Sequence, residues 1–218
     1  MDTQQRKKEV YHFIIIVPHR DSLKSLEEYR AKLFAAGFPG AWSFPTAALL
    51  ASVTRPFSKD ELKELGRNIR EITKKTDGKI ICSGNFVTKF TTEEKRRRSC
   101  TEAQEHGDKK EENLQSSTEE EEQEDFSFFG VPLNLLLEEM ILPKTARAKI
   151  LDIFSPPILC AALLASKEMP PSEEEPVISF RAASLANLAI RPLESGASGY
   201  SFEWKMGPLI WLPKYKGG

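Results

Sequence analysis

Two strand-like runs, Ala48-Leu49-Leu50-Ala51-Ser52-Val53 and Ile158-Leu159-Cys160-Ala161-Ala162-Leu163, occupy matching positions in two halves of this 218-residue chain. Each run is almost wholly apolar, a pattern that indicates a strand with both faces buried. In the first half the order is strand, helix, strand, helix, strand, and a similar half follows. The sequence therefore predicts an α+β fold with two pseudo-symmetric lobes of mainly antiparallel sheet, helices packed outside and a central groove.

Periodicity and capping residues predict the other elements. Ser58, followed three residues later by Glu61, is typical of a capping box at a helix start, and Asp21 or Ser22 is expected to cap the preceding helix. Strands are predicted at 10–17, 47–53, 79–86, 126–131, 158–165, 177–190 and 200–211, and helices from 21 or 22 to 36, from 58, at 135–140 and at 146–154.

The chain is predicted to be one bilobal domain, 1–218, with lobe-forming halves at about 10–90 and 126–213. Between them, residues 91–125 carry 13 acidic and 6 basic side chains, a net charge of −7, and only three apolar ones. Because burial of so few apolar side chains does not offset the conformational entropy that the segment would lose on ordering, we expect a disordered acidic insertion. The rest of the chain carries a net charge of +6, which suits an anionic ligand.

The composition also predicts the cellular compartment and the cofactors. No apolar run approaches the ~20 residues of a membrane helix, so no membrane partner is expected. Three widely spaced cysteines without a CxxC motif indicate free thiols and a cytoplasmic location. The chain has no Walker loop, Rossmann glycine fingerprint or metal-ligand cluster, which predicts no cofactor and no metal. The oligomeric state is left open.

The layout resembles the 2H phosphoesterase superfamily, which contains 2′-5′ RNA ligase-like proteins and cyclic nucleotide phosphodiesterases. The resemblance rests on the strand Phe13-Ile14-Ile15-Ile16-Val17-Pro18, on Phe44-Pro45 before the 49–53 strand, on Phe129-Gly130-Val131 after the insertion, and on Pro156-Pro157 before the 158–163 strand. It implies that each half places a His-x-Thr/Ser pair on a strand facing the groove. One histidine then acts as base and the other as acid, while the hydroxyls hold a phosphate.

This chain has no histidine at either position where that pattern requires one. The first motif aligns with Leu50-Ala51-Ser52, which keeps only the hydroxyl, and the second aligns with Leu159-Cys160-Ala161 or, one residue on, with Cys160-Ala161-Ala162. His12, His19 and His106 are the only histidines, and none begins a His-x-Thr/Ser. Leucine and alanine transfer no protons, so Leu50, Ser52, Leu159 and Ala161 are predicted to be degenerate motif positions and no catalytic residue is assigned.

Several polar and aromatic residues are candidates for ligand binding. Ser52, Arg55, Lys89, Arg181 and Arg191 are predicted to bind an anion, and each of the cations is equally read as an exposed charge at a strand end. The aromatic side chains of Phe202, Trp204 and Trp211 suit either base stacking or core packing.

Three functional hypotheses follow. The first is a catalytically inactive 2H-like protein that binds RNA ends, nucleotides or another phosphorylated ligand in the groove. The second is a protein-interaction scaffold with no nucleotide ligand, using the acidic insertion or an apolar cleft lined by Leu50 and Leu159. The third is an active cyclic phosphodiesterase or RNA ligase that uses residues outside the family pattern.

Overall fold

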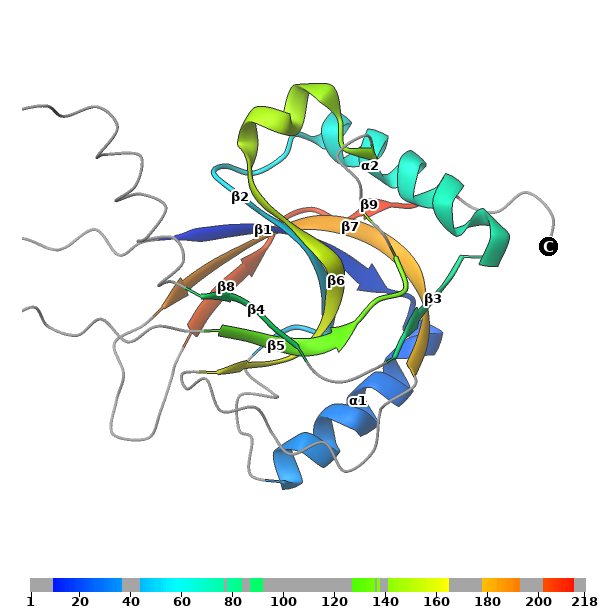
Figure 1. The fold of residues 1–218 in the computed structure, drawn as a ribbon, viewed down its shortest axis with the longest axis vertical. Helices are drawn as coiled ribbons and strands as arrows, with labels where there is room; N and C mark the ends of the chain where they lie inside the picture. The colour runs from blue at the N-terminus through cyan, green and yellow to red at the C-terminus, as the bar shows by residue number, and fades with distance from the viewer. Residues whose placement is uncertain are drawn as a thin grey trace, which may run out of the picture.

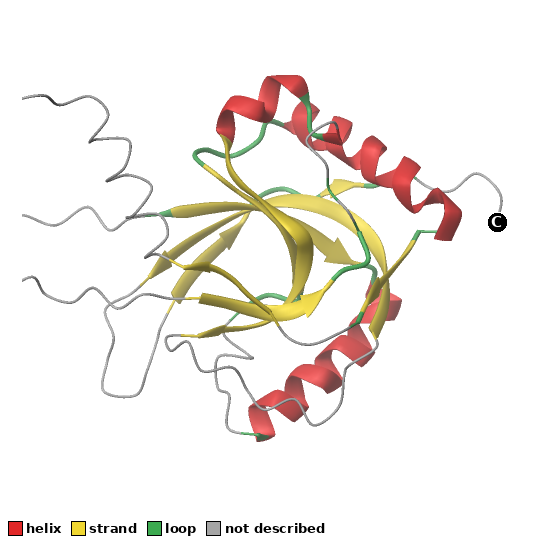
Figure 2. Ribbon diagram, viewed as in Figure 1, coloured by secondary structure: helices red, strands yellow, loops and turns green. Residues whose placement is uncertain are grey.

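A computed structural model describes residues 10–36, 44–76, 78–83, 87–91, 127–135, 137, 141–164, 178–192 and 202–213 (Figure 1). The acidic insertion beyond Thr91 and most of the helix predicted at 135–140 lie outside these residues. The elements, coloured by type in Figure 2, are β1 (Tyr11–Pro18), α1 (Arg20–Ala35), β2 (Ala47–Val53), α2 (Lys59–Ile72), η2 (Thr73–Thr76), β3 (Lys79–Cys82), β4 (Val87–Thr91), β5 (Ser127–Pro132), η4 (Lys144–Lys149), β6 (Ile150–Leu164), β7 (Ile178–Pro192), β8 (Phe202–Met206) and β9 (Ile210–Trp211).

The described strands form one sheet in the order β3-β7-β1-β2-β6-β5-β4, and β8 and β9 also pair with β7. All of these pairings are antiparallel. The prediction of an α+β chain with mainly antiparallel sheet is therefore confirmed. Two pseudo-symmetric lobes with a central groove are not confirmed, because the described strands make a single continuous sheet.

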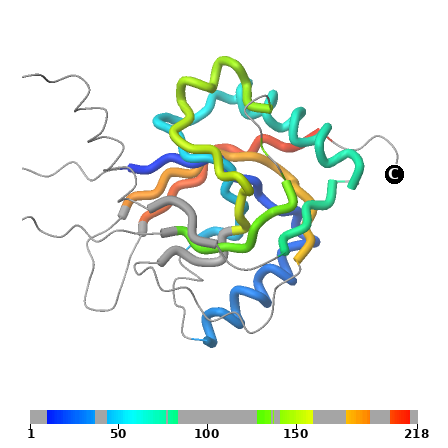
Figure 3. The backbone as a smooth tube through the Cα atoms, in the orientation of Figure 1, coloured from blue at the N-terminus to red at the C-terminus, as the bar shows by residue number. Residues whose placement is uncertain are grey.

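The sheet closes on itself where β3 meets the end of β5. Cys82 forms a bridge with Leu133, and the backbone N–H of Asn134 donates to the carbonyl of Ile81 at 2.7 Å. β3 is also paired with β7, so it joins two parts of the sheet that are far apart in strand order. Figure 3 shows the backbone of β3 and of the end of β5 running together.

Buried apolar side chains form two clusters on opposite faces of the sheet, because successive strand residues point to alternate sides. The helix-side cluster contains Ile14 and Ile16 of β1 together with the apolar faces of α1 and α2. The concave cluster contains Phe13 and Ile15. The rings of Phe13 and Phe128 lie 4.9 Å apart although β2 and β6 separate their strands, so the sheet curls around the concave cluster.

The two helices begin where polar side chains bind their first backbone N–H groups. Ser58 and Glu61 form the predicted capping box of α2. In α1, however, His19 is the cap, with its Nδ1 accepting from the N–H of Asp21, so the prediction of Asp21 or Ser22 was wrong by a few residues. The apolar stripe of α2 packs into the helix-side cluster through Leu62, Leu65 and Ile69. Burial of each of these side chains contributes roughly 1.5–3 kcal/mol.

Two predicted elements differ from the observed ones in the second half of the chain. The helix predicted at 146–154 is wrong, because only 144–149 is helical, in the short η4, and β6 begins at Ile150. Residues 150–153 pair with the end of β2, and this long-range pairing outweighs the local helical spacing. The strand predicted at 200–211 is broken after Met206, where the N–H of Gly207 donates to the carbonyl of Asn187.

Candidate functional site

The degenerate motif positions lie on neighbouring strands in the middle of the sheet. β2 pairs with β6 so that Ala48 is opposite Leu159 and Leu49 is opposite Ile158. The side chains of Leu50 and Leu159 are 1% and 3% exposed, and both belong to the helix-side cluster. Neither side chain therefore lines an open groove, and the apolar cleft predicted between them is filled core.

A β-bulge at Leu50 separates the two residues of the first motif. In the pairing with β1, Ser52 is opposite Phe13 and Ala51 is opposite Ile14, but Leu49 is opposite Ile15. One extra residue, Leu50, is thus inserted in β2, and the alternation that would have placed positions 50 and 52 on one face is lost. Leu50 packs on the helix side, whereas Ser52 shares the face of Phe13 in the concave cluster.

The hydroxyl of Ser52 is buried and has no hydrogen-bond partner within the described part of the chain. Its position opposite Asp152 on β6 gives it a carboxylate-bearing neighbour on the same face. Ala161 lies in β6 as predicted, but its side chain is not among those that the structure describes.

The predicted anion-binding cations do not converge. Arg181 and Arg191 are ten residues apart on β7, which corresponds to roughly 33 Å along a strand. Arg191 already donates to the carboxylate of Glu203 at 3.3 Å. Arg55 is exposed beyond the end of β2. Lys89 lies in β4, but its side chain is not among those that the structure describes. Arg55, Arg181 and Arg191 are therefore read as exposed strand-end charges.

The two described histidines take structural places. His12 is partly buried in β1, and burial lowers its pKa. Its Nδ1 has no hydrogen-bond partner among the described groups. His19 stands at the opposite end of the same strand and caps α1. Two groups at opposite ends of an extended strand cannot act together on one phosphate, and His106 lies outside the described residues.

A nearly buried ion pair holds the start of α2 against the start of β6. The ammonium of Lys149 lies 2.6 and 2.9 Å from the two carboxylate oxygens of Glu61, and the side chains are 12% and 9% exposed. Burial alone raises the pKa of Glu61, but hydrogen bonds from Lys149 and Ser58 hold it below its usual value. Sequence reasoning found the capping role of Glu61 and missed Lys149, which is 88 residues away.

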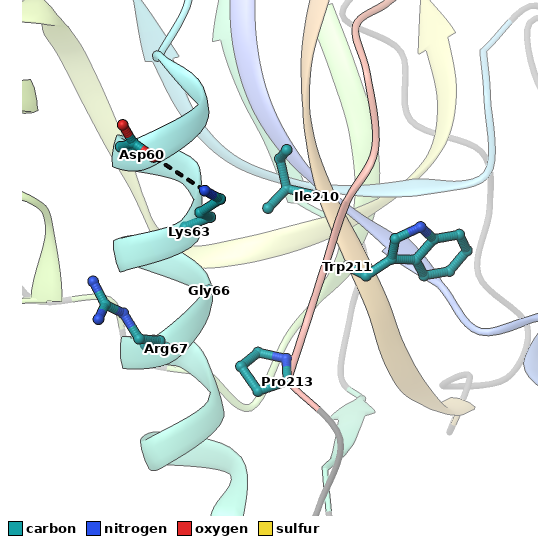
Figure 4. A pocket seen from close by; sticks show the side chains of 7 residues that line it. All are labelled: Asp60, Lys63, Gly66, Arg67, Ile210, Trp211 and Pro213. Carbon is teal, nitrogen blue, oxygen red and sulfur yellow. Dashed lines mark hydrogen bonds and ion pairs between the residues drawn. The ribbon is translucent and has the colours of Figure 1, made fainter.

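A hollow of about 440 Å³ lies between α2 and β9. It is lined by Asp60, Lys63, Gly66 and Arg67 of α2 and by Ile210, Trp211 and Pro213 (Figure 4). Ile210 and Pro213 point toward the helix, whereas the ring of Trp211 points away from it. Sequence reasoning named Trp211 for its aromatic ring, and it missed Lys63 and Arg67 because their spacing along α2 is that of any exposed helix face.

No family model, curated protein or solved structure matches this chain. Among the described helices, none is long and apolar enough to cross a membrane. Within the same residues, no group of three or more His, Cys, Asp or Glu side chains is placed to hold a metal ion.

Proposed function

We propose that this chain is a non-catalytic protein of 2H phosphoesterase-like fold that acts by binding a protein partner. The observation that carries the proposal is the burial of Leu50 and Leu159 in one apolar cluster. These are positions that the resemblance assigns to the two proton-transferring histidines, with Cys160 as the alternative to Leu159 in the second strand. A site that excludes water and holds only hydrocarbon has no group to activate a nucleophile or to protonate a leaving oxygen.

The order of the strands supports a duplicated ancestry. The pairs β1–β2 and β5–β6 flank the central β2–β6 pairing in mirrored order. In our proposal the two pseudo-symmetric lobes meet at β2 and β6, and apolar side chains occupy the space in which a groove would open. The Cys82 thiol is free and buried, which agrees with a reducing, cytoplasmic setting.

The arrangement of charge favours a protein over a phosphorylated small molecule. A phosphate site needs several convergent donors, whereas Arg181 and Arg191 stand far apart on β7. The net charge of +6 outside residues 91–125 keeps RNA ends or nucleotides as the second candidate ligand. Surviving phosphodiesterase or ligase activity is the least supported of the three hypotheses.

Two assays on the purified chain test the proposal. We expect no turnover of a 2′,3′-cyclic nucleotide above the buffer rate, and no saturable binding of a 3′-phosphorylated RNA oligonucleotide at physiological salt. Turnover that survives repurification would overturn the non-catalytic assignment. Tight RNA binding that weakens steeply with salt, and is lost in Arg55→Glu, would instead establish the second candidate.

A further inference from the structure

The surface around the α2–β9 hollow combines exposed apolar groups with an excess of basic side chains on α2. The Trp211 side chain is 70% exposed, the largest value among the big apolar side chains that the structure describes, and Leu209 and Trp204 are also exposed. Contiguous exposed apolar groups on a protein surface mark interaction sites. We define the docking surface as Lys63, Arg67, Leu209, Ile210, Trp211 and Pro213.

The floor of this surface is held in place by the core. Gly66 lets the chain after β9 approach α2 closely, because a Cβ at this position would lie 2.9 Å from a methyl group of Leu212. The N–H of Leu212 donates to the carbonyl of Ala183 at 2.9 Å. Ile210 is paired with Leu185 of β7. A partner therefore meets a preformed surface, which lowers the entropic cost of binding.

The charges on the helix rim favour an acidic occupant. Lys63 and Arg67 are one turn apart on α2 and both line the hollow. In Figure 4 the Lys63 side chain points toward β9, whereas the Arg67 guanidinium extends from the other side of α2. Among the described residues the Lys63 ammonium pairs with Asp60, which also lines the hollow, at 3.2 Å, and the Lys63 side chain is 51% exposed. Arg67 has no ion pair with any described residue. Along α2 and η2, six cations (Lys59, Lys63, Arg67, Arg70, Lys74 and Lys75) outnumber the three carboxylates of Asp60, Glu64 and Glu71 that are not buried.

The aromatic groups extend beyond the hollow. Trp211 is opposite Ser184 and Trp204 is opposite Ile190 on β7. The six-residue separation places both indoles on one face of the sheet edge, roughly 20 Å apart. The Trp211 ring points away from α2 (Figure 4), so an occupant that contacts both α2 and the face of this ring must extend across β9. Tryptophan and arginine are the residues most enriched where proteins bind one another.

We infer that this docking surface binds an acidic, apolar-containing segment of a partner protein. Its carboxylates pair with Lys63 and Arg67, and its apolar side chains cross β9 and pack on Trp211. This inference rests on the proposed function and specifies the partner chemistry and the surface that receives it.

The test is selection of a displayed random peptide library on the immobilised full chain. Enriched sequences should be rich in Asp and Glu with at least one large apolar residue. Synthetic copies should bind about tenfold more weakly to Arg67→Glu and to Trp211→Ser. The matched control is Lys32→Glu, an exposed cation of α1 on the other side of the molecule, which should leave binding unchanged (Figure 1). Both test residues are exposed, and unchanged thermal unfolding midpoints verify the folded state.

The possible outcomes distinguish failure of this docking surface from failure of the proposed function. If acidic peptides are enriched but their binding is unaffected by Arg67→Glu and Trp211→Ser, the docking surface is wrong, while the proposal of partner binding stands. Enrichment of neutral or basic peptides would overturn the inferred chemistry. Competition by inorganic phosphate at low millimolar concentration, with no effect of Trp211→Ser, would show an anion site in place of a peptide site and would count against both proposals.

Discussion

Removal of the Lys149 ammonium is the sharpest test of how α2 is fixed to the sheet. In Lys149→Met the apolar stem is kept, and the carboxylate of Glu61 loses both of its contacts to nitrogen, at 2.6 and 2.9 Å. The N–H of Ser58 still donates to Glu61, so the helix cap survives in part. The perturbation thus isolates the charge pairing.

The expected loss follows from the burial of the pair. At an effective dielectric constant of about 20, unit charges about 3 Å apart attract by roughly 5–6 kcal/mol. Desolvation of two groups that are only 9% and 12% exposed offsets several kcal/mol of this attraction. We therefore expect Lys149→Met to lower the free energy of unfolding by about 3 kcal/mol. With a urea m-value of about 2 kcal/mol/M, the midpoint falls by about 1.5 M, which tryptophan fluorescence can follow.

The pH dependence gives a second readout. The folded pKa of Glu61 is held below its usual value, so the pair stabilises the protein above the unfolded carboxyl pKa of about 4.3 and loses this effect as pH falls through the folded pKa. Without Lys149, only the hydrogen bonds from Ser58 oppose burial, so the pKa of Glu61 should be higher than in the wild type. The stability difference between wild type and Lys149→Met should therefore be largest near neutrality and shrink below about pH 4.

Lys63→Met provides the matched control, because Lys63 contacts Asp60 at a similar distance of 3.2 Å but in solvent. Exposed pairs contribute about 0–1 kcal/mol, so this variant should unfold close to the wild-type midpoint. If Lys149→Met costs no more than Lys63→Met, or if its cost does not change between neutral and acidic pH, the ionic anchoring of α2 is refuted.

Three further predictions concern the core and its polar links. Leu50→His, alone or with Leu159→His, should lower the free energy of unfolding by about 3 kcal/mol or more, because both positions are buried away from water. Neither variant should turn over a 2′,3′-cyclic nucleotide. A folded and active double variant would contradict this prediction. Asn187→Ala should cost about 2 kcal/mol in urea unfolding, since both the N–H and the carbonyl of Phe57 lose their partner, and Asn187→Asp, which sets a carboxylate oxygen against the carbonyl of Phe57, should cost no less. Burial raises the pKa of the Cys82 thiol to about 12, so peptide mapping should find it unmodified by iodoacetamide at pH 8 in the native protein and modified in urea.

Local chemistry was sufficient to predict much of the first half of the chain. The run 47–53 is apolar except for Ser52 and became β2 with the predicted bounds. The spacing of Ser58 and Glu61 defined the start of α2, because a capping box needs only neighbouring residues. Both features depend on interactions within a few positions, which a single sequence displays directly.

Features that depend on distant partners could not be predicted. Residues 150–153 have apolar groups compatible with a helix or a strand, and only pairing with β2 decides between them. The ion pair of Glu61 with Lys149 joins residues 88 positions apart. The chain after β9 packs closely on α2 because Gly66 admits Leu212, a contact that neither residue reveals by itself.

In the 2H-like ancestry that we propose, loss of the catalytic pattern and the bulge at Leu50 belong together. A His-x-Ser pair can serve one groove only if both side chains share a strand face, so a functional motif constrains β2 to unbroken alternation. Once leucine replaces the base, an extra residue at this position costs no activity. Leu50 then packs with Leu159 under the helices, while Ser52 turns to the concave side with its hydroxyl unpaired among the described groups. Restoring the histidines alone therefore does not restore the site, because the strand register would also have to shift by one residue. In this chain the surface available for binding lies at the α2–β9 edge rather than at the centre of the sheet.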